Sequence, residues 1–160
     1  MSEFRIEKRR AEAALTLATG TTVRGCFFLS GSSATRSGPE RVADLLNAET
    51  GFFPFELHPD GPPQTVLYNR THLLLVALLE EPVESQFVPD YGIAKERAVR
   101  ILLSNGISVE GQVRVYRPTG RDRLSDYARG PEAFRYVETA GGTVIVNAEH
   151  IVEFRETTQA

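Results

Sequence analysis

The chain has 160 residues, of which 41% are hydrophobic, 24% are charged and 9% are aromatic, and this globular composition excludes a disordered or fibrous protein. The longest apolar run, Leu73–Leu79, is far too short to span a membrane, and no apolar leader follows the charged residues 1–10. The single cysteine excludes an internal disulfide or a cysteine-cluster metal site, and the net charge of −3 argues against general nucleic-acid binding. We therefore expect a cytoplasmic protein.

Three sequence blocks recur in the same order and indicate an internal duplication. The paired blocks are Leu15–Gly25 with Ile101–Gly111, Arg41–Asp44 with Arg123–Asp126, and Thr65–Leu74 with Thr143–Val152. This order predicts an N-terminal arm (1–12), a first repeat (13–79), a linker (80–96), a second repeat (97–156) and a tail (157–160).

Each repeat begins with the pattern of a β-hairpin. Residues 13–17 alternate between apolar and polar side chains, which predicts a half-buried strand. Thr19-Gly20 then marks a tight turn, and a second strand is expected over 22–29. The second repeat shows the same pattern over 99–116, with Asn105-Gly106 at the turn.

A glycine lies inside the second strand of each repeat, at Gly25 and Gly111. Glycine within a strand is typical of a bulge, a sharp bend or a close approach of two backbones. We expect the strand to bend strongly there. Cys26, beside the first of these glycines, is expected to be a small core residue rather than a nucleophile.

A short helix is predicted between the second and third strands. Val42, Leu45 and Leu46 have the i, i+3, i+4 spacing of an apolar helical stripe, and residues 124–128 repeat the pattern.

Each predicted helix carries an arginine and an aspartate three residues apart. The pairs are Arg41 with Asp44, and Arg123 with Asp126. Because side chains at i and i+3 are neighbours on a helix, we interpret both pairs as structural salt bridges. A functional role for these pairs is the alternative interpretation.

Three further strands complete each repeat. They are expected over 52–57, 65–68 and 72–79 in the first repeat, and over 134–139, 143–146 and 150–155 in the second. Five short strands in so small a unit favour a closed sheet without exposed edges. The predicted fold is therefore mainly β: two tandem small five-stranded barrels, each with a short helix between strands two and three. Units this small are marginal alone, so we expect the two to pack as a pseudo-two-fold pair.

Some apolar residues are expected to need a partner outside their own barrel. Adjacent residues on a strand face opposite sides, so one residue of Phe27-Phe28 and one of Phe52-Phe53 must point away from the local core. Leu73–Leu79 is apolar on both faces, which predicts coverage by the other repeat or by another subunit.

The hairpin with its Asn-Gly turn and Val-x-Gly strand, together with the closing block Thr143–Phe154, resembles the Sm-like small barrels, including the bacterial Hfq-like proteins. The closing block is also similar to bacterial domains of unknown function that end in Asn-x-x-His-Ile-Val. The resemblance implies a tandem Sm-like repeat.

Two departures from the family pattern weigh against a carry-over of RNA binding. The helix lies between strands two and three rather than at the N-terminus, and the family's nucleotide-binding Asp-x-x-Asn motif has its match, Asp44–Asn47, far beyond Gly25.

An asparagine and a histidine recur three residues apart, as Asn69 with His72 and as Asn147 with His150. We interpret them as a structural turn, in which the asparagine caps a local amide and the histidine bonds a nearby carbonyl or carboxylate. The alternative is a hydrolytic or metal site at the paired histidines. No third ligand has metal-like spacing, and His58 lies in a proline-rich loop, so no metal site is expected.

Arginines are concentrated in the second repeat, where residues 97–135 hold eight of them against four acidic residues. The candidate contacts to an anion or a nucleic acid are Arg114, Arg117, Arg121, Arg123 and Tyr127. The alternatives are a solvated surface facing the acidic linker, or charge complementarity that drives self-association.

No nucleophile elbow, phosphate loop or metalloprotease motif is present, and no cofactor is implied. The sequence thus favours a non-enzymatic binding or assembly module whose partner is a second copy or another protein. Binding of a nucleic acid or an anionic ligand through the second repeat is the alternative.

Overall fold

The computed structural model describes residues 8–30, 40–58, 61–79, 95–115, 128 and 130–157. The first repeat contains strands β1 (Lys8–Leu17), β2 (Thr22–Ser30), β3 (Phe52–Leu57), β4 (Gln64–Asn69) and β5 (Leu73–Leu78), with helix α1 (Val42–Ala48) and the 3-10 turn η2 (Arg70–His72). The second contains β6 (Lys95–Leu103), β7 (Ser108–Val115), β8 (Phe134–Thr139), β9 (Gly142–Asn147) and β10 (Ile151–Glu156), with the 3-10 turn η5 (Ala148–His150). The prediction of a mainly β protein is confirmed.

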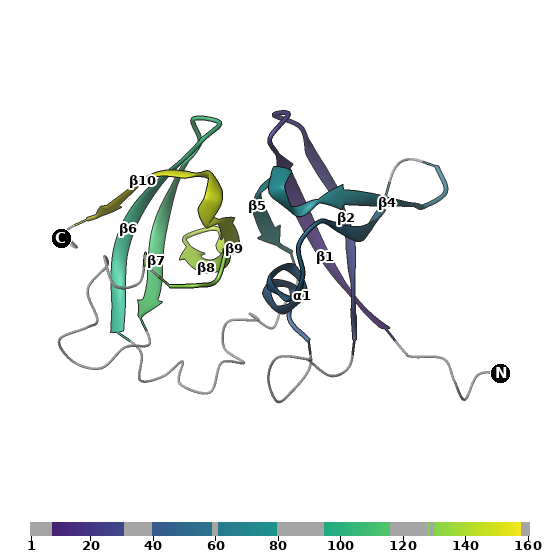
Figure 1. Cartoon of the computed structure of the whole chain (residues 1–160), viewed down its shortest axis with the longest axis horizontal. Helices are drawn as coiled ribbons and strands as arrows, with labels where there is room; N and C mark the ends of the chain where they lie inside the picture. Colours follow the sequence, from purple (N-terminus) through teal and green to yellow (C-terminus); the bar gives the residue numbers. More distant parts are fainter. Residues whose placement is uncertain are drawn as a thin grey trace.

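The two repeats have the same strand order, and together they form one continuous antiparallel sheet of ten strands. Its order is β10-β6-β7-β8-β9-β5-β1-β2-β3-β4. Figure 1 shows the repeats as two halves side by side, with β5 and β9 at their junction and α1 next to it. Strands four and five of each repeat thus occupy its two edges.

The expected pair of separately closed barrels was not found, because β5 does not pair with β4 of its own repeat. It lies between β1 and β9 instead. The sequence of β5 explains this position, since it is apolar on both faces. Leu73 packs in a core formed mainly by the first repeat, and Leu74 packs in the core of the second.

Two strands begin earlier than the sequence pattern suggests. β1 starts at Lys8 rather than at residue 13, because its ladder with β2 continues to the pair Lys8 and Ser30. The extension shows no apolar alternation in the sequence, because Arg9 and Arg10 are charged and exposed. β6 likewise starts at Lys95 rather than at 97. The predicted second helix, over residues 124–128, lies outside the described residues except for Ala128. Ala128 is helical.

Gly25 and Gly111 allow a close approach of two strand backbones. A Cβ atom at Gly25 would overlap the carbonyl oxygen of Glu56 on β3, and one at Gly111 would overlap that of Glu138 on β8. Both repeats therefore need glycine where the second strand crosses the third. Gly20 and Gly106 end the hairpin turns with the same φ of +89°, a conformation that favours glycine.

Aromatic side chains fill the core of the first repeat. Phe27 stacks on Phe53 and meets Phe55 edge to face, with ring centroids 5.6 Å and 5.1 Å apart. Their neighbours Phe28 and Phe52 are less buried, as the alternation of strand residues requires.

Among the described residues, no helix is long and apolar enough to cross a membrane.

Candidate functional site

The two repeats meet in a joint formed by β5 and β9. The paired residues are Leu75 with Val146, Val76 with Ile145, and Ala77 with Val144. Phe134 and Ile145 of the second repeat also belong to the core of the first repeat. The joint is therefore a shared hydrophobic core as well as a set of backbone hydrogen bonds.

Asn147 bridges the two repeats from the end of β9. Its buried side-chain Nδ2 donates to the carbonyl oxygens of Leu73, at 2.9 Å, and Arg70, at 3.3 Å. Its Oδ1 accepts from the backbone N–H of Glu149 at 3.0 Å and so also shapes its own turn. A buried amide with all these partners fixes the register of the joint.

His150 crosses the joint beside Asn147. Its Nε2 donates to the carbonyl oxygen of Thr71 at 2.6 Å, because a carbonyl only accepts. In the neutral ring, Nδ1 then accepts from the hydroxyl of Ser104 at 2.8 Å. The turns η2 and η5 thus converge, and both nitrogens of His150 are engaged in structural contacts.

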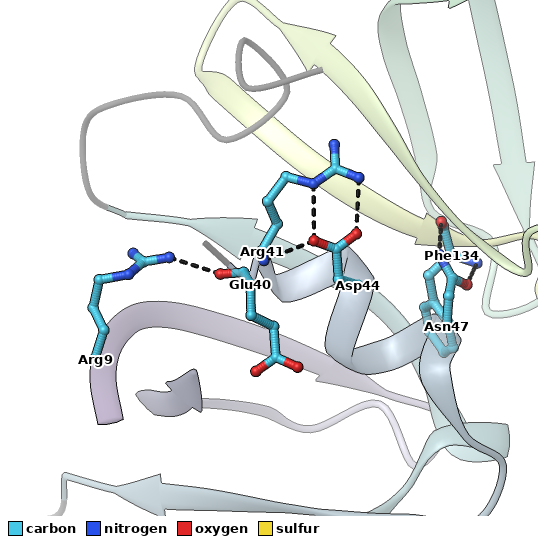
Figure 2. A network of polar contacts seen from close by, with 6 residues as sticks. All are labelled: Arg9, Glu40, Arg41, Asp44, Asn47 and Phe134. Atoms are coloured by element: carbon cyan, nitrogen blue, oxygen red, sulfur yellow. Dashed lines mark hydrogen bonds and ion pairs between the residues drawn. The ribbon is translucent and has the colours of Figure 1, made fainter. Parts of the chain in front are cut away.

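Helix α1 is held at the joint by polar contacts that Figure 2 shows. Asp44 accepts from the backbone N–H of Arg41 at 2.9 Å and from its guanidinium at 2.8 and 3.1 Å. The carbonyl of Glu40, just before the helix, accepts from Arg9 on β1 at 2.9 Å. The guanidinium of Arg41 also lies over the ring of Tyr136 on β8, 5.5 Å from its centroid. The interaction of Arg41 with Asp44 therefore orients a contact with the second repeat.

Asn47 makes the second contact of α1 with the second repeat. Its Nδ2 donates to the carbonyl oxygen of Phe134, and its Oδ1 accepts from the N–H of the same residue, both at 2.9 Å. This reciprocal pair extends backbone-like hydrogen bonding from the end of α1 to the start of β8.

Arg70 anchors the other side of the joint from η2. Its buried guanidinium donates to the carbonyl oxygens of Leu46, Leu45 and Phe52 at 3.1, 2.9 and 2.6 Å. Desolvation by burial lowers the pKa of Arg70, while the nearby charge of Glu49 raises it. Arg70 thereby satisfies carbonyls at the end of α1 and the start of β3.

A cleft of about 480 Å³ lies where these groups converge. Its lining includes Gly51, Arg70 and Asn147, and three acidic residues, Glu49, Glu132 and Glu149. Because Arg70 is occupied by three carbonyls, the carboxylates dominate the charge of this cleft, which disfavours an anionic ligand.

The two ends of the described sheet, β4 and β10, carry the repeat counterparts of the strands in the joint. In β9 and β5, Ile145 is 0% exposed and Leu74 is 1% exposed. Their counterparts Leu67 on β4 and Val152 on β10 are 63% and 65% exposed. Phe134 at the start of β8 is 5% exposed, whereas its counterpart Phe52 is 61% exposed. Apolar residues at equivalent positions are thus buried in the joint and exposed at the edges.

The predicted turn residues of the first repeat lie at the β4 edge. Asn69 accepts from the N–H of Thr71 at 3.0 Å, which matches the contact of Asn147 with Glu149. His72, the counterpart of His150, is exposed.

Of the proposed ligand-binding residues, the structure describes only Arg114. Its guanidinium forms ion pairs with Glu96 and Glu138. The other four, Arg117, Arg121, Arg123 and Tyr127, lie outside the described residues, as does Asp126.

The sequence analysis missed the roles of Arg70 and Asn47. Arg70 is replaced by Ala148 in the second repeat, so a search for repeated residues passes over it. In the sequence, Asn47 stands out only as the last residue of an Asp-x-x-Asn motif. Its contact with Phe134 joins residues far apart in the chain, and no local pattern signals it.

Comparison with known protein families, curated protein sequences and solved structures gave no significant match. The described fold is that of a mainly β protein whose two halves have the same strand order and join edge to edge in one antiparallel sheet.

Proposed function

We propose that this chain is a non-enzymatic assembly module built from two Sm-like repeats, and that it associates with copies of itself from head to tail. In this proposal, β4 of one copy pairs with β10 of the next. The contact repeats the joint that β9 and β5 form inside the chain.

The contrast in burial between equivalent positions carries this proposal. Phe52, Leu67 and Val152 are large, apolar and exposed, while their counterparts in the joint are buried. Full burial of such a side chain contributes about 1.5–3 kcal/mol. An exposed apolar edge strand is also a ready template for pairing with another chain.

The internal joint also specifies a register for the proposed contact. The pairs of β9 and β5 translate into Leu67 opposite Phe154 and Tyr68 opposite Glu153 of the second copy. By the same equivalence, the imidazole of His72 would donate to the carbonyl oxygen of Glu149 in that copy, as His150 does to Thr71. The exposed His72 would thereby acquire the role that His150 has.

A head-to-tail contact joins two different surfaces, so it continues from one copy to the next. Such a heterologous interface produces a ring when the rotation closes and a filament when it does not.

No described feature adds support to anion binding or to catalysis. Arg114 is already in ion pairs, and the cleft at the joint is lined by acidic residues. Both nitrogens of His150 are engaged in the joint. These functions stay predictions of the sequence.

Sedimentation equilibrium of the purified chain tests the proposal. We expect oligomers for the wild-type protein and a shift to monomer for Leu67→Lys and for Val152→Lys, because each places a charge in a dry joint. Ile107→Lys is the matched control, since Ile107 is an exposed apolar residue in the β6–β7 turn and belongs to neither edge strand. A wild-type monomer at high concentration, or equal effects of all three variants, would contradict the proposal.

A further inference from the structure

We propose that Glu12, Cys26 and His58 form a zinc-binding site on the first repeat. The strand register brings them together. Glu12 on β1 lies opposite Cys26 on β2, and Cys26 lies opposite Glu56 on β3. His58 follows β3 two residues after Glu56, so it is on the same side of the chain as Glu56.

The distances between the side chains fit a metal ion of zinc's size. The potential ligand atoms of Glu12, Cys26 and His58 all lie within 4.8 Å of one another. The Sγ of Cys26 is 3.5 Å from the Nε2 of His58. In a tetrahedral zinc site, a sulfur at ~2.3 Å and a nitrogen at ~2.0 Å from the ion are about 3.5 Å apart. The ligand pair thus has the required separation without a change of the strands.

The donor types also favour zinc. A thiolate, an imidazole and a carboxylate are its ordinary protein ligands, and the thiolate disfavours magnesium and calcium, which prefer oxygen. The Oε1 of Glu56 is 3.2 Å from the same Nε2 of His58, so a second carboxylate faces this space. Arg10 lies 3.3 Å from that oxygen and balances the charge of Glu56. The carboxylate of Glu12 and the thiolate of Cys26 would each bring a negative charge to the ion.

The second repeat provides an internal comparison. At the equivalent positions it has Ala98, Gln112 and Ala140, in the same register between β6, β7 and β8. Glu138 keeps the place of Glu56. Because the same strands form without these ligands, the fold alone does not require a glutamate, a cysteine and a histidine at these three positions.

Zinc at this site would connect β1, β2 and the end of β3. An ion that binds only the folded chain stabilises it by an amount that rises with the logarithm of its free concentration above the Kd. We therefore expect zinc to raise the melting temperature of the full-length chain.

Isothermal titration of the chelator-treated full-length protein with zinc chloride tests this site. We expect one ion per chain, and with cobalt(II) a charge-transfer absorption band from the thiolate. Cys26→Ser, His58→Ala and Glu12→Gln remove one ligand each. Gln112→Ser places a serine at the equivalent position of the second repeat and serves as the matched control.

We expect Cys26→Ser and His58→Ala to weaken zinc binding by more than about 100-fold, beyond the ~10–100-fold cost of losing an outer-shell partner. Gln112→Ser should bind zinc like the wild type. Because His58 is exposed, its variant gives a clear result even if Cys26→Ser fails to fold. Absence of zinc binding by the wild type, or equal affinity in the wild type and His58→Ala, would overturn the proposal.

Discussion

Single residues show where the duplicated sequence is constrained and where it has diverged. Gly25 and Gly111 are the same residue for the same reason, because a strand crosses too close for a Cβ atom. Arg70 and its counterpart Ala148 differ, and the guanidinium of Arg70 donates to carbonyls of α1 and β3. At the glycines, identity between the repeats therefore reflects the fold, and at Arg70 the difference reflects contacts of the first repeat.

Gly25→Ala is expected to destabilise the protein by at least about 3 kcal/mol, the upper end of the usual range for overpacking. The obstacle is the backbone of Glu56, which cannot move aside as a flexible side chain can. Unfolding in urea measures the loss. Gly61→Ala is the control, because Gly61 has open space around its Cα and no positive φ. Equal stability of the two variants would show that β2 and β3 do not approach so closely.

At the scale of elements, the turns after β4 and β9 have the same sequence pattern in different surroundings. The side chains of Asn69 and Asn147 both accept from a backbone N–H of their own turn, but only Asn147 donates to two carbonyls across the joint. The turns are thus equivalent locally and differ in what lies next to them.

Asn147→Ala should therefore lower the free energy of unfolding by about 1–3 kcal/mol more than Asn69→Ala, because it removes a donor from the carbonyls of Leu73 and Arg70 in the buried joint. Urea unfolding at low protein concentration measures both variants without a contribution from association. Asn69→Ala should instead weaken self-association. Equal destabilisation by the two changes would mean that Asn147 does not hold the joint.

The elements with local signals were predictable from the sequence. Residues close together in the chain predict the hairpin turns at Gly20 and Gly106, the second strands with their internal glycines, and the stripe of α1. The early start of β1 was not predicted, because its first three residues are charged and show no apolar alternation. The pairing of β5 with β9 was not predicted, because a strand that is apolar on both faces indicates that both faces are covered. It does not indicate which strand lies beside it. The cluster of Glu12, Cys26 and His58 was missed because strand register, rather than motif spacing, assembles it.

At the scale of the whole molecule, the joint inside the chain is the template for the contact between chains that we propose. The described sheet ends in β4 on one side and β10 on the other, and the two edges are the counterparts of the strands that pair in its middle. A chain with one blocked edge should keep the other edge intact. The two edges can therefore be tested separately.

The most direct measurement is the mass of mixed edge variants by sedimentation equilibrium. Leu67→Lys blocks the β4 edge and Val152→Lys blocks the β10 edge, so each variant alone should be a monomer. Their equimolar mixture should form a dimer and nothing larger, because only one β4 edge and one β10 edge remain to pair. Dimers of either variant alone, or a mixture that stays monomeric while the wild type assembles, would contradict head-to-tail pairing.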